Sequence, residues 1–203
     1  KKCAKLAASY HICSFVHGVL NTDNININGE SFDYGPYRFL EKYDPHKIAA
    51  YFDHSGLYKF SNQTDAIFWN LQQLASIMTI FLEDDPIVNE LKKYVNYYNE
   101  EVIKLFFKKL SLQPSDDYES NQLFLNNFYQ ILSQYPYLYE EIFFDFRGGR
   151  QNKRFETEIK EKYNNHDVEK IFSNQEAISN FNSLEFYKPE TLLYEEIEKI
   201  WYQ

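Results

Sequence analysis

The sequence contains little cysteine, no long apolar run and a deficit of positive charge, and each shortage excludes a class of protein. Its two cysteines, Cys3 and Cys13, fall on one predicted helix, which holds them too far apart to form a disulfide. No uninterrupted apolar run is long enough to span a bilayer, and no signal-peptide pattern is present. The 21 Lys and Arg residues face 30 Asp and Glu residues, and the formal net charge of -9 argues against a protein that binds nucleic-acid backbones. We therefore expect reduced thiols and neither a membrane nor a nucleic-acid partner.

Several catalytic motifs are absent as well, among them Gly-x-Ser-x-Gly, His-Glu-x-x-His and the Walker phosphate loop. Aromatic residues are abundant, because 18 Tyr and 18 Phe supply bulky side chains for a core. A chain of 203 residues suits one domain, or one lobe with an attached subdomain. It begins at Lys1 without an initiator Met, and we expect it to be part of a longer protein.

Helical periodicity dominates the chain outside residues 16–64. Apolar residues recur at intervals of three and four before and after this stretch. Asp65 is suited to cap a helix, and Pro86 is suited to a first helical position. The pattern predicts a mainly α fold, with helices at about 3–15, 65–81, 86–106, 120–134, 137–146, 153–163, 167–182 and 190–202.

A polar segment divides the predicted helices into two groups. The sequence SLQPSDDYES, residues 111–120, is the best candidate for a boundary between two bodies. We predict a first domain over residues 1–110 and a C-terminal helical region over residues 111–203.

A short β-hairpin is predicted at about residues 25–32. Two isoleucines alternate with asparagines, and the pair Asn28-Gly29 that follows is the strongest short-range signal for a two-residue turn of type I′. With that turn, Ile25, Ile27 and Phe32 would lie on one face and the polar residues on the other, because successive side chains of a strand alternate. The apolar face is expected to anchor the hairpin to a core.

The same turn would place Asn24 directly opposite Asp33. Directly opposed residues of antiparallel strands have Cβ atoms roughly 4.5–5.5 Å apart, so an amide oxygen and a carboxylate could converge on one small cation. Magnesium binds oxygen ligands, usually one or two from the protein and the rest from phosphate and water. Taken alone, the pattern is better explained by a surface hairpin whose polar face meets water, and its context has to decide between the two interpretations.

The residues around the hairpin follow the order seen in kinase-fold enzymes. Those enzymes place a histidine, a base aspartate two residues later and a metal-binding asparagine five residues beyond, followed by a hairpin and an Asp-Phe-Gly triplet. This chain has His17, Asn24 and the triplet Asp33-Tyr34-Gly35 in that order. Val19 occupies the position of the base, and a valine cannot accept a proton. By this criterion the protein is a pseudokinase that keeps a metal site.

Two longer stretches resemble a known family. The stretch SFVHGVLNTDNININGESFDYGPYRFLEKYDP closely resembles the selenoprotein O family, also called SelO or YdiU, and GLYKFSNQTDAIFWNLQQLA resembles a second segment of it. Together they cover roughly residues 4–76. Leu57 stands where the family usually carries Arg, and Thr64 where it usually carries Pro. Members of this family have a kinase-like fold but transfer AMP, rather than phosphate, from ATP to Ser, Thr or Tyr hydroxyls of proteins.

The resemblance implies roles for three residues of this chain. Asn24 and Asp33 would bind Mg²⁺, or Mn²⁺, together with ATP, and Asp23 would be the catalytic base. The chain would be a protein-kinase-like C-lobe without its N-lobe, inactive when alone, and part of a Mg-ATP-dependent protein adenylyltransferase. Its partners would be ATP and protein substrates that bear Ser, Thr or Tyr. Its location would be the cytoplasm in a bacterium and the mitochondrion in a eukaryote.

Two other functions remain open from the sequence. The protein could be a nonstandard kinase that transfers phosphate, or an inactive pseudokinase scaffold that binds a protein partner through its C-terminal helices. The presence of Asp23, Asn24 and Asp33 together favours an active site over a scaffold, because a dead site has no need of all three.

Overall fold

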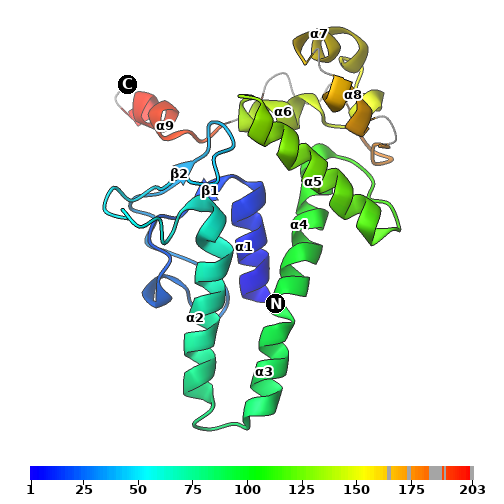
Figure 1. The fold of residues 1–203 in the computed structure, drawn as a ribbon. Coiled ribbons are helices and arrows are strands. Elements are labelled where there is room, and N and C mark those ends of the chain that lie inside the picture. Colours follow the sequence, from blue (N-terminus) through cyan, green and yellow to red (C-terminus); the bar gives the residue numbers. More distant parts are fainter. Residues whose placement is uncertain (164–165, 173–174, 183–188, 190, 202–203) are drawn as a thin grey trace. The chain divides into compact units, whose positions relative to one another are not determined.

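The computed structural model describes residues 1–163, 166–172, 175–182, 189 and 191–201. Over these residues the protein is mainly helical, as the periodicity predicts, with one two-stranded antiparallel sheet. Its helices and strands are α1 (Lys2–Ile12), β1 (Phe15–Val16), β2 (Arg38–Phe39), α2 (Gln63–Met78), α3 (Asp84–Lys92), α4 (Tyr94–Leu110), α5 (Tyr118–Gln134), α6 (Tyr139–Asp145), α7 (Lys160–Lys162), α8 (His166–Phe172) and α9 (Tyr194–Trp201) (Figure 1). The mainly α fold class is thus confirmed, and the kinase-like arrangement stays a prediction.

The chain divides into two compact units. The first contains Lys1–Leu40 and Asp44–Val102, and the second contains Glu41–Tyr43 and Ile103–Gln203. Helix α4 contributes its first half to the first unit and its second half to the second unit. The catalytic loop and the hairpin predicted from the sequence belong to the first unit.

The packing of α1 against α2 forms the core of the first unit. Ala4 and Ala7 of α1 are buried in this core together with Ile67 of α2 and Leu20 of the loop after β1. Alanine has no side-chain atom beyond Cβ, so the helix can approach its neighbours closely. The loop that follows β1 therefore rests on a rigid pair of helices.

Burial of His11 makes the stability of the first unit depend on pH. The His11 ring lies edge-on against Phe60, and its Nδ1 is 2.6 Å from the Tyr98 hydroxyl. Burial lowers the pKa of His11 from 6.5 to about 4. Between these two pH values the unfolded chain binds a proton that the folded chain does not, so stability falls as the pH falls from 6.5 to about 4.

We expect urea unfolding to reveal this loss, at up to about 1.4 kcal/mol per pH unit. The variant His11→Gln lacks the titrating ring, so its stability should fall less steeply over the same pH window. The measurement is the difference between the unfolding free energies of the two proteins at each pH. A difference that does not change with pH would contradict the assignment.

Phenylalanine rings form the core of the second unit. Phe106 of α4, Phe128 of α5 and Phe143 of α6 contact one another, with ring centroids 5.2, 4.8 and 5.9 Å apart. Phe172 of α8 stacks on Phe146 at 4.3 Å. All five side chains are fully buried, so the abundant aromatic residues do serve as core material.

A buried carboxylate organises the segment after α6. Asp145 is 2% exposed and accepts hydrogen bonds from Lys162 Nζ at 2.7 Å and from the Tyr163 hydroxyl at 2.8 Å. The guanidinium group of Arg154 lies 3.3 Å from its other oxygen. Burial raises the pKa of the Tyr163 hydroxyl, and the negative charge of Asp145 acts in the same direction. One carboxylate therefore holds together the end of α6, the π-helical turn η4 (Phe155–Ile159) and the end of α7.

The predicted helix at 86–106 is two helices, α3 and α4. They are separated at Lys93, whose N–H donates to Glu90 O rather than continuing the helical pattern. Pro86 is the third residue of α3, not the first. A proline is tolerated there because the first N–H groups of a helix have no partner within the helix.

The predicted helix at 167–182 is wrong in its second half. Helix α8 ends at Phe172, and residues 175–182 are not helical. The segment after α4 takes their backbone hydrogen bonds instead, since Gln113 N–H donates to Glu176 O at 2.8 Å. This pairing is between segments distant in sequence, and local periodicity does not predict it.

The other helices agree with the prediction apart from their ends. The prediction at 153–163 corresponds to η4 and α7, and the prediction at 190–202 corresponds to α9, with residues 190 and 202 outside the described residues. In the part of the chain that the structure describes, no helix combines the length and the apolar character needed to cross a bilayer.

Candidate functional site

The chain reverses at the predicted hairpin, but no strand forms there, since the two strands of the structure are β1 and β2, and the register of the reversal differs from the prediction by one residue. Ile25 forms an isolated antiparallel bridge with Ser31. Asn26 N–H donates to Glu30 O at 2.9 Å, and Gly29 N–H donates to Asn26 O at 3.0 Å. The turn therefore contains three residues instead of two, and Gly29 takes the left-handed conformation with φ +75°. The prediction of a two-residue type I′ turn was wrong because an Asn-Gly pair also fits this longer turn.

The start of α1 explains why glycine is needed in this turn. A Cβ atom on Gly29 would lie 2.6 Å from the Cβ of Lys2 and 2.9 Å from its carbonyl carbon. The turn thus approaches the first residues of α1 more closely than any side chain would allow. The hairpin is held on the first unit at this point.

The one-residue shift changes which side chains share a face. Phe32 N–H donates to Asn24 O at 3.1 Å, so Asn24 lies opposite Phe32 and its predicted direct pairing with Asp33 is wrong. The predicted apolar face is also wrong, because Ile27 is 84% exposed in the turn and Ile25 packs against the core without it. Asp33 follows Phe32 directly, so Asn24 and Asp33 remain neighbours across the chain reversal without being directly opposed.

Asn24 is buried, and its amide group has a fixed direction. Asn24 is the last residue of η1 (Thr22–Asn24), which is one turn of 3₁₀ helix. Its Nδ2 donates a hydrogen bond to Val19 O at 2.8 Å. A carbonyl oxygen can only accept, so the NH₂ side of the amide must face Val19. The Oδ1 atom of Asn24 accepts no hydrogen bond from the described residues. This oxygen is available to a ligand.

Asp33 lies at an unusual bend. Its φ of +60° is in the left-handed region, which Asp and Asn adopt more readily than other residues with a side chain. Its carboxylate is exposed and makes neither a hydrogen bond nor an ion pair with the part of the chain that the structure describes. The bend thus presents a carboxylate that the fold itself does not use.

Tyr34 fixes the position of this bend. Its ring contacts the rings of His17 and Phe15, with centroids 5.2 and 5.8 Å apart. Its hydroxyl donates to Ser31 O at 2.5 Å. The aromatic residue of the Asp-Tyr-Gly triplet therefore keeps ring contacts with His17 and Phe15 although it is 45% exposed, and the aspartate before it faces solvent.

His17 joins the predicted catalytic loop to the segment that carries Asp33. The ring is fully buried, its Nε2 lies 2.9 Å from Phe32 O, and Val19 N–H donates to its Nδ1 at 3.4 Å. Those partners require a neutral ring with its proton on Nε2. Burial lowers the pKa of His17, while the hydrogen bond to Phe32 O and the charge of Asp33 act against that shift. We interpret His17 as a positioning residue.

Two amide side chains of α2 hold the backbone of the loop. Gln63 accepts from His17 N–H at 2.9 Å and donates to Phe15 O at 2.8 Å. Asn70, two helical turns later, donates to Leu20 O at 3.0 Å. Sequence reasoning missed both residues, although both belong to the second stretch that resembles the SelO family. The resemblance of that stretch to the family was the signal in the sequence that could have pointed to Gln63 and Asn70.

Asp23 lies next to Asn24 in η1 and is exposed. No group of three or more His, Cys, Asp or Glu residues among those described is arranged to hold a metal ion. A metal at this site would therefore depend on Asn24 and Asp33, with its other ligands coming from a nucleotide and water.

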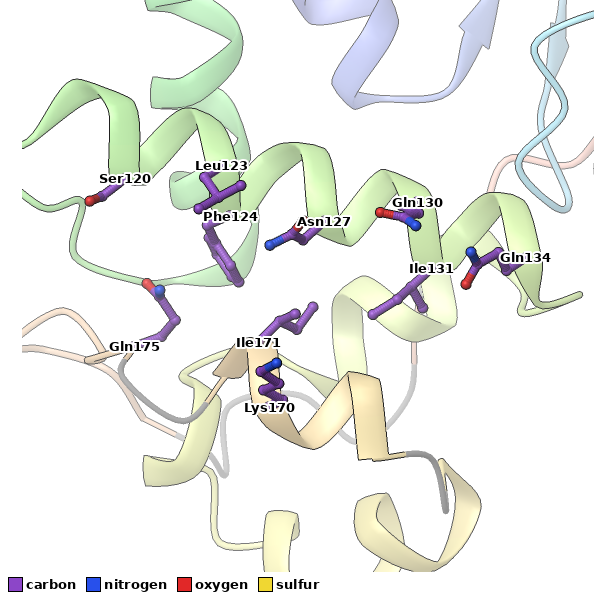
Figure 2. A pocket seen from close by; sticks show the side chains of 10 residues that line it. All are labelled: Ser120, Leu123, Phe124, Asn127, Gln130, Ile131, Gln134, Lys170, Ile171 and Gln175. Carbon is purple, nitrogen blue, oxygen red and sulfur yellow. The ribbon is translucent and has the colours of Figure 1, made fainter.

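A pocket of about 440 Å³ in the second unit contains none of the predicted site residues. It lies between α5 and α8, and Figure 2 shows the side chains that line it: Ser120, Leu123, Phe124, Asn127, Gln130, Ile131, Gln134, Lys170, Ile171 and Gln175. The lining has amide groups, apolar side chains and one lysine, but no carboxylate. It therefore lacks the charged oxygen ligands that a magnesium–nucleotide site requires. The loop of the first unit is the better candidate site.

The family of the chain follows from its sequence as a whole. The family model described as "Protein adenylyltransferase SelO" matches residues 1–200, and the chain belongs to this family. The match extends beyond residues 4–76, where the motifs carry the resemblance, and includes the second unit.

Curated proteins similar to this chain are named "Protein nucleotidyltransferase YdiU". The one from Trichodesmium erythraeum is 34% identical over 176 residues, which is 87% of this chain and 35% of the relative. The one from Synechocystis is 36% identical over 151 residues, or 72% of this chain and 32% of the relative. The one from Pseudomonas fluorescens is 40% identical over 114 residues, or 56% of this chain and 23% of the relative. The chain spans about a third of the length of the first of these relatives.

Proposed function

We propose that the protein containing this chain transfers AMP from ATP to Ser, Thr or Tyr hydroxyls of other proteins. The observation that supports it most is the pair formed by Asn24 and Asp33. One amide oxygen and one carboxylate lie on neighbouring segments, and neither is used by the fold. The names of the family and of the YdiU relatives also support nucleotidyl transfer to protein.

The donor atoms of Asn24 and Asp33 fit a magnesium ion. Amide and carboxylate oxygens are the ligands that this hard cation prefers, and Mn²⁺ accepts the same atoms. The Nδ2 of Asn24 is held by Val19 O, so its oxygen is already oriented before any ligand binds. Bound magnesium would neutralise the charge that develops on the phosphoryl oxygens of ATP.

Asp23 is the proposed general base. Its carboxylate is exposed and adjacent to Asn24, so a substrate hydroxyl can approach it from solvent. The hydroxyl oxygen would form a bond to the α-phosphorus, its proton would pass to Asp23, and pyrophosphate would leave. Val19, at the position of the kinase base, acts only through its backbone, whose N–H and C=O hold His17 and Asn24.

The reaction is tested with the full-length protein and two labelled forms of ATP. We expect label on the α-phosphate to enter protein, label on the γ-phosphate not to enter it, and mass spectrometry to find AMP on Ser, Thr or Tyr. Transfer of the γ-label would identify a phosphotransferase instead. Transfer of neither label would favour the scaffold function.

A further inference from the structure

An exposed apolar surface lies at the end of α2 and continues into α3. We call it the apolar tip and define it as the large apolar side chains that are exposed there: Leu74, Ile77, Met78, Ile80, Phe81, Leu82 and Val88. Ile77 is 58% exposed, Ile80 73% and Phe81 81%. Figure 1 shows the connection between α2 and α3 at the end of α2 that lies away from β1 and β2. A cluster of large exposed apolar side chains along one segment is typical of an interaction site.

The exposed apolar residues follow one another closely along the end of α2 and its connection to α3. Leu74 and Met78 are four residues apart and lie on one side of the last turn of α2, and Phe81 follows in the turn after α2, where its N–H donates to Met78 O at 3.0 Å. Helix α3 has no buried residue at all, although its sequence is amphipathic. An amphipathic helix whose apolar side is not buried has an unpartnered face.

The charge beside the most exposed part of the apolar tip is negative, and the nearest basic residues, Lys92 and Lys93, lie at the other end of α3. Residues 66–91 contain no Lys, Arg or His, and their four carboxylates are all in or beside α3. Glu90 pairs with Lys93. Glu83, Asp84 and Asp85 form no ion pair within the described residues, and they stand next to the most exposed apolar side chains. The surface therefore combines apolar area with uncompensated negative charge.

We propose that the apolar tip binds a basic amphipathic helix of a partner protein. The apolar stripe of such a helix would cover the apolar tip, and its lysines or arginines would pair with Glu83, Asp84 and Asp85. This inference does not depend on the proposed function, because the apolar tip contains none of the site residues.

Charge disfavours two other occupants of the apolar tip, which are a second copy of the chain and a membrane surface. A second copy of the chain would bring two sets of carboxylates together, in a protein whose formal net charge is already -9. A membrane surface with anionic lipids would repel the same carboxylates, and the nearest basic side chains, Lys92 and Lys93, lie at the end of α3 away from them. A partner of opposite charge fits both properties of the surface.

The first test measures binding of designed peptides to the full-length protein by fluorescence anisotropy. The probe is a Leu-Lys peptide of about 18 residues, or about 27 Å of helix, with all leucines on one face. We expect it to bind at least about tenfold more tightly than a peptide of the same composition without an apolar face, and than a Leu-Glu peptide of the same pattern. Equal binding of the three peptides, or no binding of the first, would overturn the proposal.

Variants then locate the binding surface. Ile77→Asp and Phe81→Asp should each weaken binding of the Leu-Lys peptide at least about tenfold, because both side chains are exposed and the change spares the core. Ile27→Asp is the matched control, an exposed isoleucine in the hairpin turn, and should leave binding unchanged. Circular dichroism verifies that all three variants keep their helices. Equal losses in Ile27→Asp and Ile77→Asp would exclude the apolar tip as the site.

Two further readouts identify the alternatives. Dimers in sedimentation experiments that disappear in Phe81→Asp would assign the apolar tip to a second copy. Binding to zwitterionic lipid vesicles that disappears in the same variant would assign it to a membrane. Either result would replace the proposal.

Discussion

Replacing Asp33 with Asn in the full-length protein is expected to reduce AMP transfer by roughly 10²–10³-fold. The change removes the negative charge that would face the metal and the nucleotide. It keeps the left-handed bend at φ +60°, because Asn adopts that conformation as readily as Asp does. The measurement is the initial rate of α-label transfer, with circular dichroism to verify the fold. Asp33→Ala would be a poorer variant, because it adds backbone strain to the lost charge.

The matched control for this variant is Glu30→Gln. Glu30 is an exposed carboxylate on the same hairpin, where it accepts a hydrogen bond from Asn26 Nδ2 at 3.1 Å. Removing its charge should leave the transfer rate nearly unchanged. If Asp33→Asn retains the rate of the unmodified protein, Asp33 is not a metal ligand, and the proposed site is wrong even if AMP transfer itself is observed.

Replacing Asp145 with Asn is expected to lower the free energy of unfolding of the second unit by roughly 2–4 kcal/mol. The carboxylate is buried and binds Lys162, Tyr163 and Arg154. An amide has no charge to offset the two cations, and its NH₂ group cannot accept a hydrogen bond. The expected loss of stability is at the lower end of the range for breaking a buried ion pair, because Lys162 and Arg154 are about a third exposed and can regain water. Urea unfolding, followed by the aromatic signal of the second unit, measures the change.

Glu141→Gln is the control for this second prediction. Glu141 Oε1 lies 2.8 Å from the same Lys162 Nζ, but the pair is partly exposed. Its loss should therefore cost less than about 1 kcal/mol. Equal effects of Asp145→Asn and Glu141→Gln would mean that burial does not strengthen the contacts of Asp145.

The sequence could predict that Asn24 and Asp33 lie on neighbouring segments, but not the register of those segments, and their roles stay a prediction. Motif order brings Asn24 and Asp33 to one chain reversal, and the structure has them on neighbouring segments. The prediction of direct pairing was wrong because an Asn-Gly pair is compatible with both two-residue and three-residue turns. The observed turn brings Gly29 close to Lys2 of α1, a tertiary contact that no local pattern reveals.

Helices were predictable where one side of the helix packs on a core. The aromatic stripes of α4 and α5 have a clear period, so α5 was expected, and most of α4 was expected as part of the longer helix predicted at 86–106. Helical periodicity could not predict where α8 ends or what Gln63 and Asn70 do. Each of these features depends on a hydrogen bond to a distant segment. Polar contacts of that kind depend on tertiary structure.

The backbone at Asp33 has a thermodynamic consequence. A left-handed conformation in a residue other than glycine costs about 1 kcal/mol or more, and a glycine there would avoid that penalty. The Asp33 side chain returns nothing to the folded state, since it neither packs in the core nor bonds to another described residue. Folding alone therefore does not account for an aspartate at this bend, whereas a binding role would.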